Sequence, residues 1–282
     1  MAFDNANPQF KDSLFRDFFN DPVRLLDLCN SLLHSNYSDI DDIEINTLEA
    51  NFFSGLKNDI SCKLDNHFLV LVEHQSTVNE NMPFRFLSYI SELLNNLVKD
   101  KKIIYRKGLI SLPAPNFFVF YDGNDESEPV NRIMRLSDSF NGFSSSLELI
   151  VRSININLNK QADILHRCHY LLDYSTLIAY VKLNLAEGLS RRNAIIYAID
   201  RCISENVMCD YLSKKKDEVF SMLDFQWNLD DAKAAWQDEA RNEAFESVAL
   251  NMLKDGLPVD QILKFTNLPL DQIQVLAQSL SH

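Results

Sequence analysis

NDISCKLDNHFLVLVEHQ, residues 58–75, contains two short apolar segments separated by a turn signal. Residues 68–72, FLVLV, form an unbroken apolar run of strand length, which is typical of a central strand buried on both faces. Asp65 and Asn66 favour a turn directly before this run. The stretch is therefore predicted to form a β-hairpin whose second strand lies inside a sheet.

Two carboxylates flank this hairpin, Asp59 at its start and Glu73 at its end. Folding the hairpin brings Asp59 near Glu73, and the two-residue period of a strand places Glu73 and Gln75 on one face. Carboxylates at the end of a buried strand cost free energy unless they are paired or bind a metal. The residues alone leave two interpretations open, a metal site or an ion pair with solvated strand ends.

Short motifs around the hairpin occur in an order that resembles a known family. They are Asn58-Asp59-Ile60-Ser61 before the apolar strand, and Glu73-His74-Gln75-Ser76-Thr77, Asn81-Met82-Pro83 and Arg85 after it. In these motifs the chain is similar to the recombination-promoting nuclease / putative transposase family, which belongs to the PD-(D/E)XK nuclease superfamily. The segments NINLNK, RCHYLLDYS, AIDRCISENVMCDYL and KKKDEVFSML in the C-terminal half resemble the same family.

The resemblance implies a fold and a set of site residues. The fold is an α/β core of restriction-endonuclease type, a mixed sheet flanked by helices, followed by an all-helical C-terminal region. The implied catalytic residues are Asp59, Glu73 and Gln75, with Gln75 in place of the superfamily's usual lysine. Asp59, Glu73 and the backbone carbonyl of His74 are the expected ligands of Mg²⁺, or alternatively of Mn²⁺, because hard divalent cations prefer oxygen. Asp12 matches a further ligand position of the family, and its alternative role is that of a solvated acid in the first turn of a helix.

The implied function is that of a metal-dependent DNA endonuclease, which hydrolyses DNA phosphodiesters and so promotes recombination or mobile-element movement. The first alternative is a catalytically weak or inactive nuclease-fold protein that acts in DNA binding or protein interaction. The amide of Gln75 favours this alternative, because it cannot offer the positive charge of a lysine. A second alternative is a helical interaction module joined to an unrelated β domain.

A DNA partner requires local cations, because the chain as a whole carries a net charge of −13. A basic patch can coexist with an acidic whole. The candidate contact with the DNA backbone is the basic run Lys99, Lys101, Lys102, Arg106 and Lys107. A solvated helix end and loop is the alternative for this run. Arg85, just inside a predicted helix, is expected either to reach a phosphate or to pair with the carboxylates, and a surface salt bridge is the alternative.

The chain is expected to divide into a nuclease-like domain over 1–158, a helical region over 159–248 and a small helical tail over 249–282. Helices are predicted at about 160–186, 190–206, 207–223 and 230–255. The tail contains a repeated Leu-Pro-x-Asp-Gln-Ile unit, at 257–262 and 268–273, which predicts two short helices. They could form a helix-turn-helix-like DNA reader. Their scarcity of cations favours packing or homo-oligomerisation instead.

The chain is expected to be cytoplasmic and to have no membrane partner. Its five cysteines are an odd number without paired spacing, which favours a reduced compartment. The N-terminal sequence lacks the basic region and apolar core of a signal peptide. The sequence as a whole contains no apolar run of about 18 residues, the length that a membrane-spanning helix requires.

Overall fold

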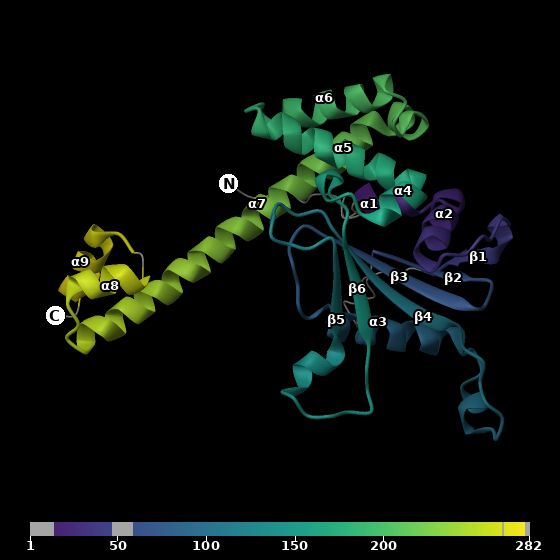
Figure 1. Cartoon of the computed structure of the whole chain (residues 1–282), viewed down its shortest axis with the longest axis horizontal. Helices are drawn as coiled ribbons and strands as arrows, with labels where there is room; N and C mark the ends of the chain where they lie inside the picture. The colour runs from purple at the N-terminus through teal and green to yellow at the C-terminus, as the bar shows by residue number, and fades with distance from the viewer. Residues whose placement is uncertain (1–13, 47–58, 267, 280–282) are drawn as a thin grey trace, which may run out of the picture. The chain divides into compact units, whose positions relative to one another are not determined.

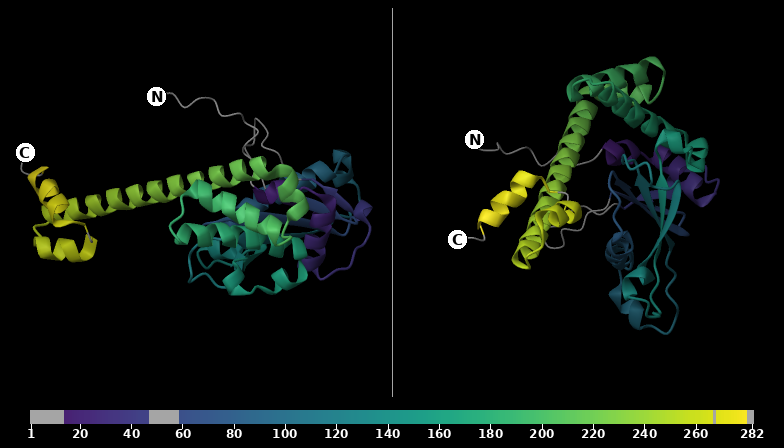
Figure 2. Two further views of the ribbon diagram at one scale, coloured as in Figure 1. Left: turned by 90° about the horizontal axis from the view of Figure 1, so that it is seen from above. Right: turned by 60° about the vertical axis from the view of Figure 1, so that its left-hand side comes forward.

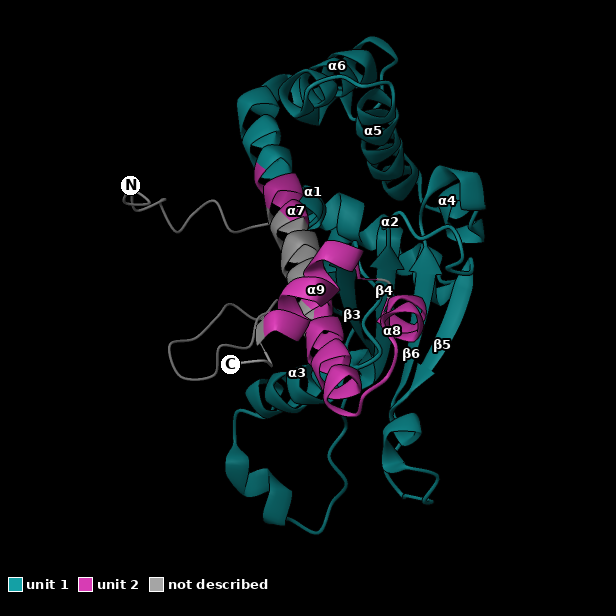
Figure 3. Ribbon diagram, turned by 90° about the vertical axis from the view of Figure 1, so that its left-hand side faces the viewer, with its two compact units in different colours: residues 1–224 teal, residues 225–282 magenta. Residues whose placement is uncertain are grey.

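The computed structural model describes residues 14–46, 59–266 and 268–279 of the chain. It divides into two compact units, Met1–Asp224 and Phe225–His282 (Figure 3). The first unit contains a sheet with helices, and the second is built from helices alone. This confirms the predicted α/β core and helical C-terminal region, whereas the predicted boundaries at residues 158 and 248 remain predictions.

The described residues form a six-stranded mixed sheet with the order β1-β2-β3-β4-β6-β5 (Figure 1). β3 pairs with β2 in antiparallel and with β4 in parallel orientation. β6 lies parallel to β4, and β5 closes the edge antiparallel to β6. The strands are β1 (Ile43–Ile45), β2 (Ile60–Leu64), β3 (Phe68–Gln75), β4 (Ala114–Tyr121), β5 (Asn131–Arg135) and β6 (Ile150–Asn155).

The predicted hairpin is confirmed as β2 and β3. Its register pairs Leu64 with Phe68 and Ile60 with Val72. Asp65 and Asn66 have φ angles of 43° and 53°. Two successive positive φ angles are what a tight type I′ hairpin turn requires, and Asn and Asp tolerate them better than other residues with a side chain. The turn is therefore fixed by local chemistry.

The helices of the first unit cover both faces of β3 (Figures 1 and 2). α3 (Met82–Leu97) packs Phe86 and Leu93 against Leu69 and Leu71 of β3. On the other face, Phe15 of α1 (Leu14–Phe19) packs on the end of the sheet. The remaining helices of this unit are α2 (Pro22–Leu33), α4 (Asp163–Arg167), α5 (His169–Ala186), α6 (Arg191–Ser204) and the beginning of α7 (Cys209–Lys254). The 3₁₀ segments are η2 (Ile40–Asp42), η3 (Lys101–Tyr105), η4 (Leu136–Phe140) and η5 (Leu158–Lys160).

The predicted division between helices over 207–223 and 230–255 is at the wrong place. α7 (Cys209–Lys254) consists of two helices joined across a kink at Lys215, which has φ −122° and ψ 25°. The first unit ends at Asp224, within α7. The sequence from 209 to 254 contains no glycine or proline, so no helix-breaking residue marks the predicted division.

The second unit consists of the later part of α7 with α8 (Val259–Thr266) and α9 (Leu270–Ser279). Both short helices begin directly after the prolines of the repeated unit, which confirms the two predicted tail helices. They bury Ile262, Leu268 and Ile273 against Ala249 of α7. This small core accounts for the repeated apolar positions by packing within the chain, and homo-oligomerisation through the tail remains a prediction.

None of the helices that the structure describes is long and apolar enough to cross a membrane.

The hairpin turn gives a direct test of the register. Replacing Asn66 by valine should lower the free energy of unfolding by about 1–2 kcal/mol, because a β-branched residue is strained at positive φ. Replacing Asn66 by glycine, the control, should change it by less than about 0.5 kcal/mol. Urea denaturation measures both variants. Equal losses in the two would contradict a left-handed conformation at this position.

Candidate metal centre

Asp59 and Glu73 lie at the same end of the hairpin. The last ladder pair in this direction joins Ile60 to Val72, and the two acids are the next residues on either strand. Oδ2 of Asp59 accepts a hydrogen bond of 2.7 Å from the backbone amide of His74. The register of β2 on β3 thus places the two carboxylates close together, as predicted.

Glu73 is a buried carboxylate whose two oxygens differ in their surroundings. Its residue is 4% exposed. Oε2 accepts a hydrogen bond of 3.1 Å from Nη2 of Arg85. Oε1 is buried and accepts no hydrogen bond from any residue that the structure describes. Burying a polar oxygen without a hydrogen bond costs free energy, so a bound cation at Oε1 would stabilise the site.

Burial and the charge of Asp59 raise the pKa of Glu73 to about 8. The attraction of Arg85, together with smaller contributions from the Asp59 backbone amide and the Tyr89 hydroxyl, offsets only part of that rise. Burial disfavours the charged form, and a second carboxylate adds like-charge repulsion. At neutral pH, without a cation, Glu73 therefore holds its proton for much of the time. A divalent cation between the two acids would reverse this balance by favouring both carboxylates as anions.

Arg85 connects Glu73 to the start of α3. Asn81 precedes this helix and Pro83 lies in its first turn, so the sequence fixes where Arg85 enters the site. Nη2 of Arg85 also donates a hydrogen bond of 2.8 Å to the hydroxyl of Tyr89. Of the two roles predicted for Arg85, the structure shows the pairing with a carboxylate. Its side chain is 38% exposed, so it also remains accessible from solvent.

Gln75 lies on the same face as Glu73, as the strand period predicted. Its side-chain amide is fully accommodated when the oxygen accepts from Nη1 of Arg85 at 3.1 Å and the nitrogen donates to the carbonyl of Thr77 at 3.3 Å. Gln75 also lines a hollow whose other walls include Tyr121 of β4, Arg132 of β5 and Ser153 of β6. The side chain of Gln75, predicted to stand in place of a lysine, is therefore an amide held by Arg85 and Thr77 at the edge of this hollow.

The side chain of His74 was not predicted to have a role, and it lies on the opposite face of β3 from Glu73. Its ring is 4% exposed, with Nε2 at 3.0 Å from Oδ2 of Asp122. The hydroxyl of Tyr174 in α5 lies 3.4 Å from the same nitrogen. The ring also stacks on Phe15, with 5.1 Å between centroids. The sequence carries only a weak signal for this pair, a histidine between two site residues and an Asp-Gly turn after β4.

Asp122 also contacts Lys182 of α5, on the helical side of the sheet. Burial alone would raise its pKa, but the neighbouring His74 and Lys182 together hold the pKa below its ordinary value. The Lys182 ammonium of α5 also donates to the backbone carbonyl of Asp122 and to Oδ1 of Asn157. The end of β3 is thus held on one face by α3 and on the other by α5.

The donor set fits Mg²⁺ in type, since Mg²⁺ is often held by one or two carboxylates and keeps several waters. Asp59 and Glu73 supply the carboxylates. The backbone N–H of His74 donates to Asp59. In a strand, the N–H and C=O of one residue point toward the same neighbouring strand. The carbonyl of His74 therefore also points toward the side of Asp59. No cluster of three metal-binding side chains occurs within residues 14–46, 59–266 and 268–279. Asp12, the predicted further ligand, lies outside the described residues.

The predicted basic run is not brought to the carboxylates. Lys99, Lys101, Lys102, Arg106 and Lys107 follow the end of α3, whereas Arg85 lies in its first turn. Sixteen residues of helix measure about 24 Å. The run also precedes Ala114, which pairs with Phe68 at the beginning of β3, while Glu73 lies near the end of that strand. Carboxylates and basic run therefore occupy opposite ends of the sheet.

Comparison with known families identifies one family. A family model described as "Putative transposase, YhgA-like" matches residues 9–177, which include the sheet and both candidate carboxylates. The match covers more than half of the chain, and the chain belongs to this family. Membership associates it with the DNA transactions of mobile elements. No curated protein and no solved structure shows significant similarity to the chain.

The shifted pKa of Glu73 predicts a pH-dependent stability in the absence of metal. The carboxyl has a pKa of 4.5 when unperturbed and about 8 in the folded protein. Folding therefore takes up a proton between these values, and the free energy of unfolding falls as pH rises from about 5 to 8. In EDTA, Glu73→Gln should stabilise the protein relative to wild type by about 1–3 kcal/mol more at pH 8 than at pH 5.

Urea denaturation at the two pH values measures this difference. Glu80→Gln is the matched control, because the Glu80 side chain is 64% exposed and forms its ion pair with Arg132 at the surface. Its effect should be nearly the same at both pH values. An equal effect of Glu73→Gln at pH 5 and pH 8 would show that Glu73 is not a proton-holding buried acid.

Proposed function

We propose that the protein is a metal-dependent DNA endonuclease whose centre is formed by Asp59 and Glu73. The observation that supports it most is the buried Oε1 of Glu73, which lies beside a second carboxylate and has no hydrogen-bond partner within the described part of the chain. Membership of a transposase family makes DNA the substrate that best fits this centre. Asp59, Glu73 and the carbonyl of His74 would hold Mg²⁺ or Mn²⁺.

Hydrolysis of a phosphodiester requires an activated water and compensation of the charge that develops on the phosphate. A bound Mg²⁺ supplies both, because it acidifies water and stabilises oxyanions. The protein's own contribution is orientation. Asp59 and Glu73 fix the position of the cation, and Gln75 can hold the attacking water by hydrogen bonds from its amide. Arg85, half-exposed beside Glu73, can donate to a phosphate oxygen.

Gln75 sets the expected strength of this activity. An amide orients water but carries no charge, whereas a lysine would also stabilise hydroxide electrostatically. We therefore expect slow cleavage with a strong dependence on the divalent cation. A wild-type protein that binds DNA in Mg²⁺ and Mn²⁺ without cutting it would support the alternative, a nuclease fold that acts by binding alone.

Replacing Asp59 by asparagine tests the proposal. The amide oxygen can still accept from the backbone of His74, so the fold should persist while the charge is lost. Nicking of supercoiled plasmid in Mg²⁺ or Mn²⁺ should fall by about 100-fold or more, a typical scale for losing electrostatic stabilisation of a transition state.

Glu44→Gln is the matched control, since Glu44 pairs with Lys63 on the neighbouring strands and its side chain is 61% exposed. This variant should cut at the wild-type rate, and thermal melting of both variants should show that they are folded. Undiminished, metal-dependent nicking by Asp59→Asn would refute the assignment of the centre.

A further inference from the structure

The segment between α3 and β4, residues 98–113, is a surface feature that the candidate metal centre does not use. We name it the basic arm, and it contains the 3₁₀ segment η3. Figure 1 shows it leaving the sheet at the end where β4 begins. It carries five cations against one acid, Asp100, in a chain with a net charge of −13. The arm is thus strongly basic within an acidic protein.

Most of these cations are available to a partner. Arg106 pairs with Asp100 at 3.0 Å, and Lys101 donates to the carbonyl of Asn95. Lys99, Lys102 and Lys107 are exposed and form no ion pair with any residue that the structure describes. No acid among the described residues therefore neutralises these three lysines through an ion pair, and a polyanion is the partner of complementary charge.

The arm also exposes large apolar side chains between its cations. Tyr105 is 90% exposed, Leu109 102% and Ile104 55%. Phosphate contacts need only cations, and these apolar groups would gain nothing from them. An aromatic ring among cations is the arrangement that binds unpaired nucleic acid, because every base offers a face for stacking while the cations follow the backbone. In a duplex the same faces are already stacked on their neighbours.

We propose that the basic arm binds unpaired DNA, with Tyr105 stacked on a base and the lysines on adjacent phosphates. The choice of DNA as the polyanion rests on the proposed function. The arm follows the last residue of α3, whereas Arg85 beside the carboxylates lies in the first turn of this helix, so the stacked base lies away from the cleavage centre.

The test measures binding of the full chain to fluorescent DNA in EDTA, where metal-dependent cleavage cannot occur. Tyr105→Ala should weaken binding to a single-stranded oligonucleotide about tenfold, the usual scale for losing one stacked base. Tyr105→Phe should restore it, because phenylalanine retains the aromatic face. Affinity for a blunt duplex of equal length should change less than twofold in both variants.

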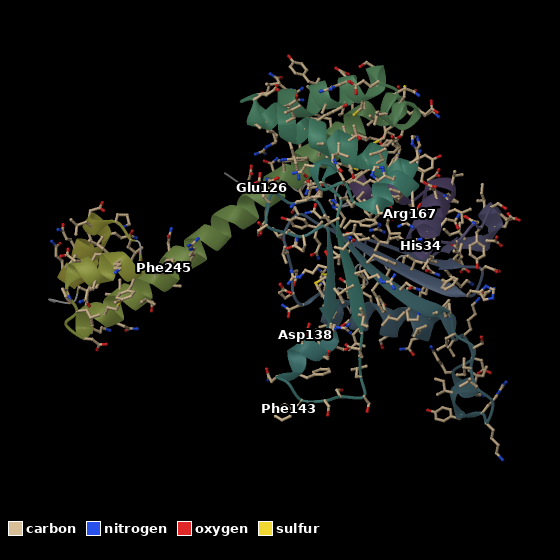
Figure 4. The ribbon with its side chains drawn as sticks, in the orientation of Figure 1. His34, Glu126, Asp138, Phe143, Arg167 and Phe245 are labelled. Carbon is tan, nitrogen blue, oxygen red and sulfur yellow. The ribbon has the colours of Figure 1, made fainter. Side chains whose placement is uncertain are left out.

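Phe143→Ala is the matched control. Phe143 is also aromatic and 78% exposed, and it points into solvent from the loop before β6 (Figure 4). Its segment, residues 136–149, contains no lysine or arginine. The variant should bind single-stranded DNA as tightly as wild type. A loss equal to that of Tyr105→Ala would show that any exposed aromatic residue matters, which would overturn the proposal.

Other outcomes separate this proposal from the proposed function. Asp59→Asn should lose cleavage but retain binding to single-stranded DNA. The cleavage assay therefore tests the metal centre, and the binding assay tests the basic arm. Unchanged single-strand affinity of Tyr105→Ala would refute the stacking role. If the wild-type arm instead bound anionic lipid vesicles, or if Tyr105→Ala abolished self-association in sedimentation while DNA binding stayed the same, the partner would be a membrane or a second copy, and the proposal would be wrong.

Discussion

The burial of Glu73 beside Asp59 is the constraint on which the rest of the site depends. Glu73 follows the apolar run of β3, and its carboxylate is enclosed. One oxygen accepts from Arg85, and the other has no hydrogen-bond partner among the residues that the structure describes. Such a group is costly in a folded protein unless something compensates it. With a raised pKa of about 8, Glu73 avoids a buried negative charge by holding a proton when no metal is bound. A bound divalent cation would instead neutralise the charge of the ionised carboxylate.

The remainder of the first unit holds this strand end in place. On the side of Glu73, the first turn of α3 brings Arg85 to the carboxylate. On the other side, the ring of His74 is enclosed by Phe15 and Asp122, and Tyr174 of α5 reaches it from the helical region. Consecutive residues of β3 therefore connect the candidate centre to two helical layers, which gives the helices after the sheet a structural link to the site.

Local signals made the hairpin and its two acids predictable. The turn at Asp65 and Asn66, the apolar run and the strand period each depend on neighbouring residues only, and together they fix the register. The partner of Glu73 was not predictable, because two roles for Arg85 were equally consistent with its place in the sequence, and the packing of α3 decides between them. The pair His74–Asp122 joins distant parts of the chain through the parallel strands β3 and β4, and periodicity contains no information on such pairs. The kink of α7 at Lys215 was not predicted, because no glycine or proline marks it and a gap in the apolar pattern is weaker evidence than a helix-breaking residue.

A crystal of the protein soaked in Mn²⁺ shows whether Asp59 and Glu73 share a metal ion. Anomalous scattering identifies the ion, independently of catalytic rate or substrate choice. We expect an anomalous peak bound by an oxygen of Asp59 and by Oε1 of Glu73, with metal–oxygen distances of about 2.1–2.3 Å. A crystal with ordered carboxylates and no peak between them, at a pH above 8 where both acids can ionise, would contradict this expectation.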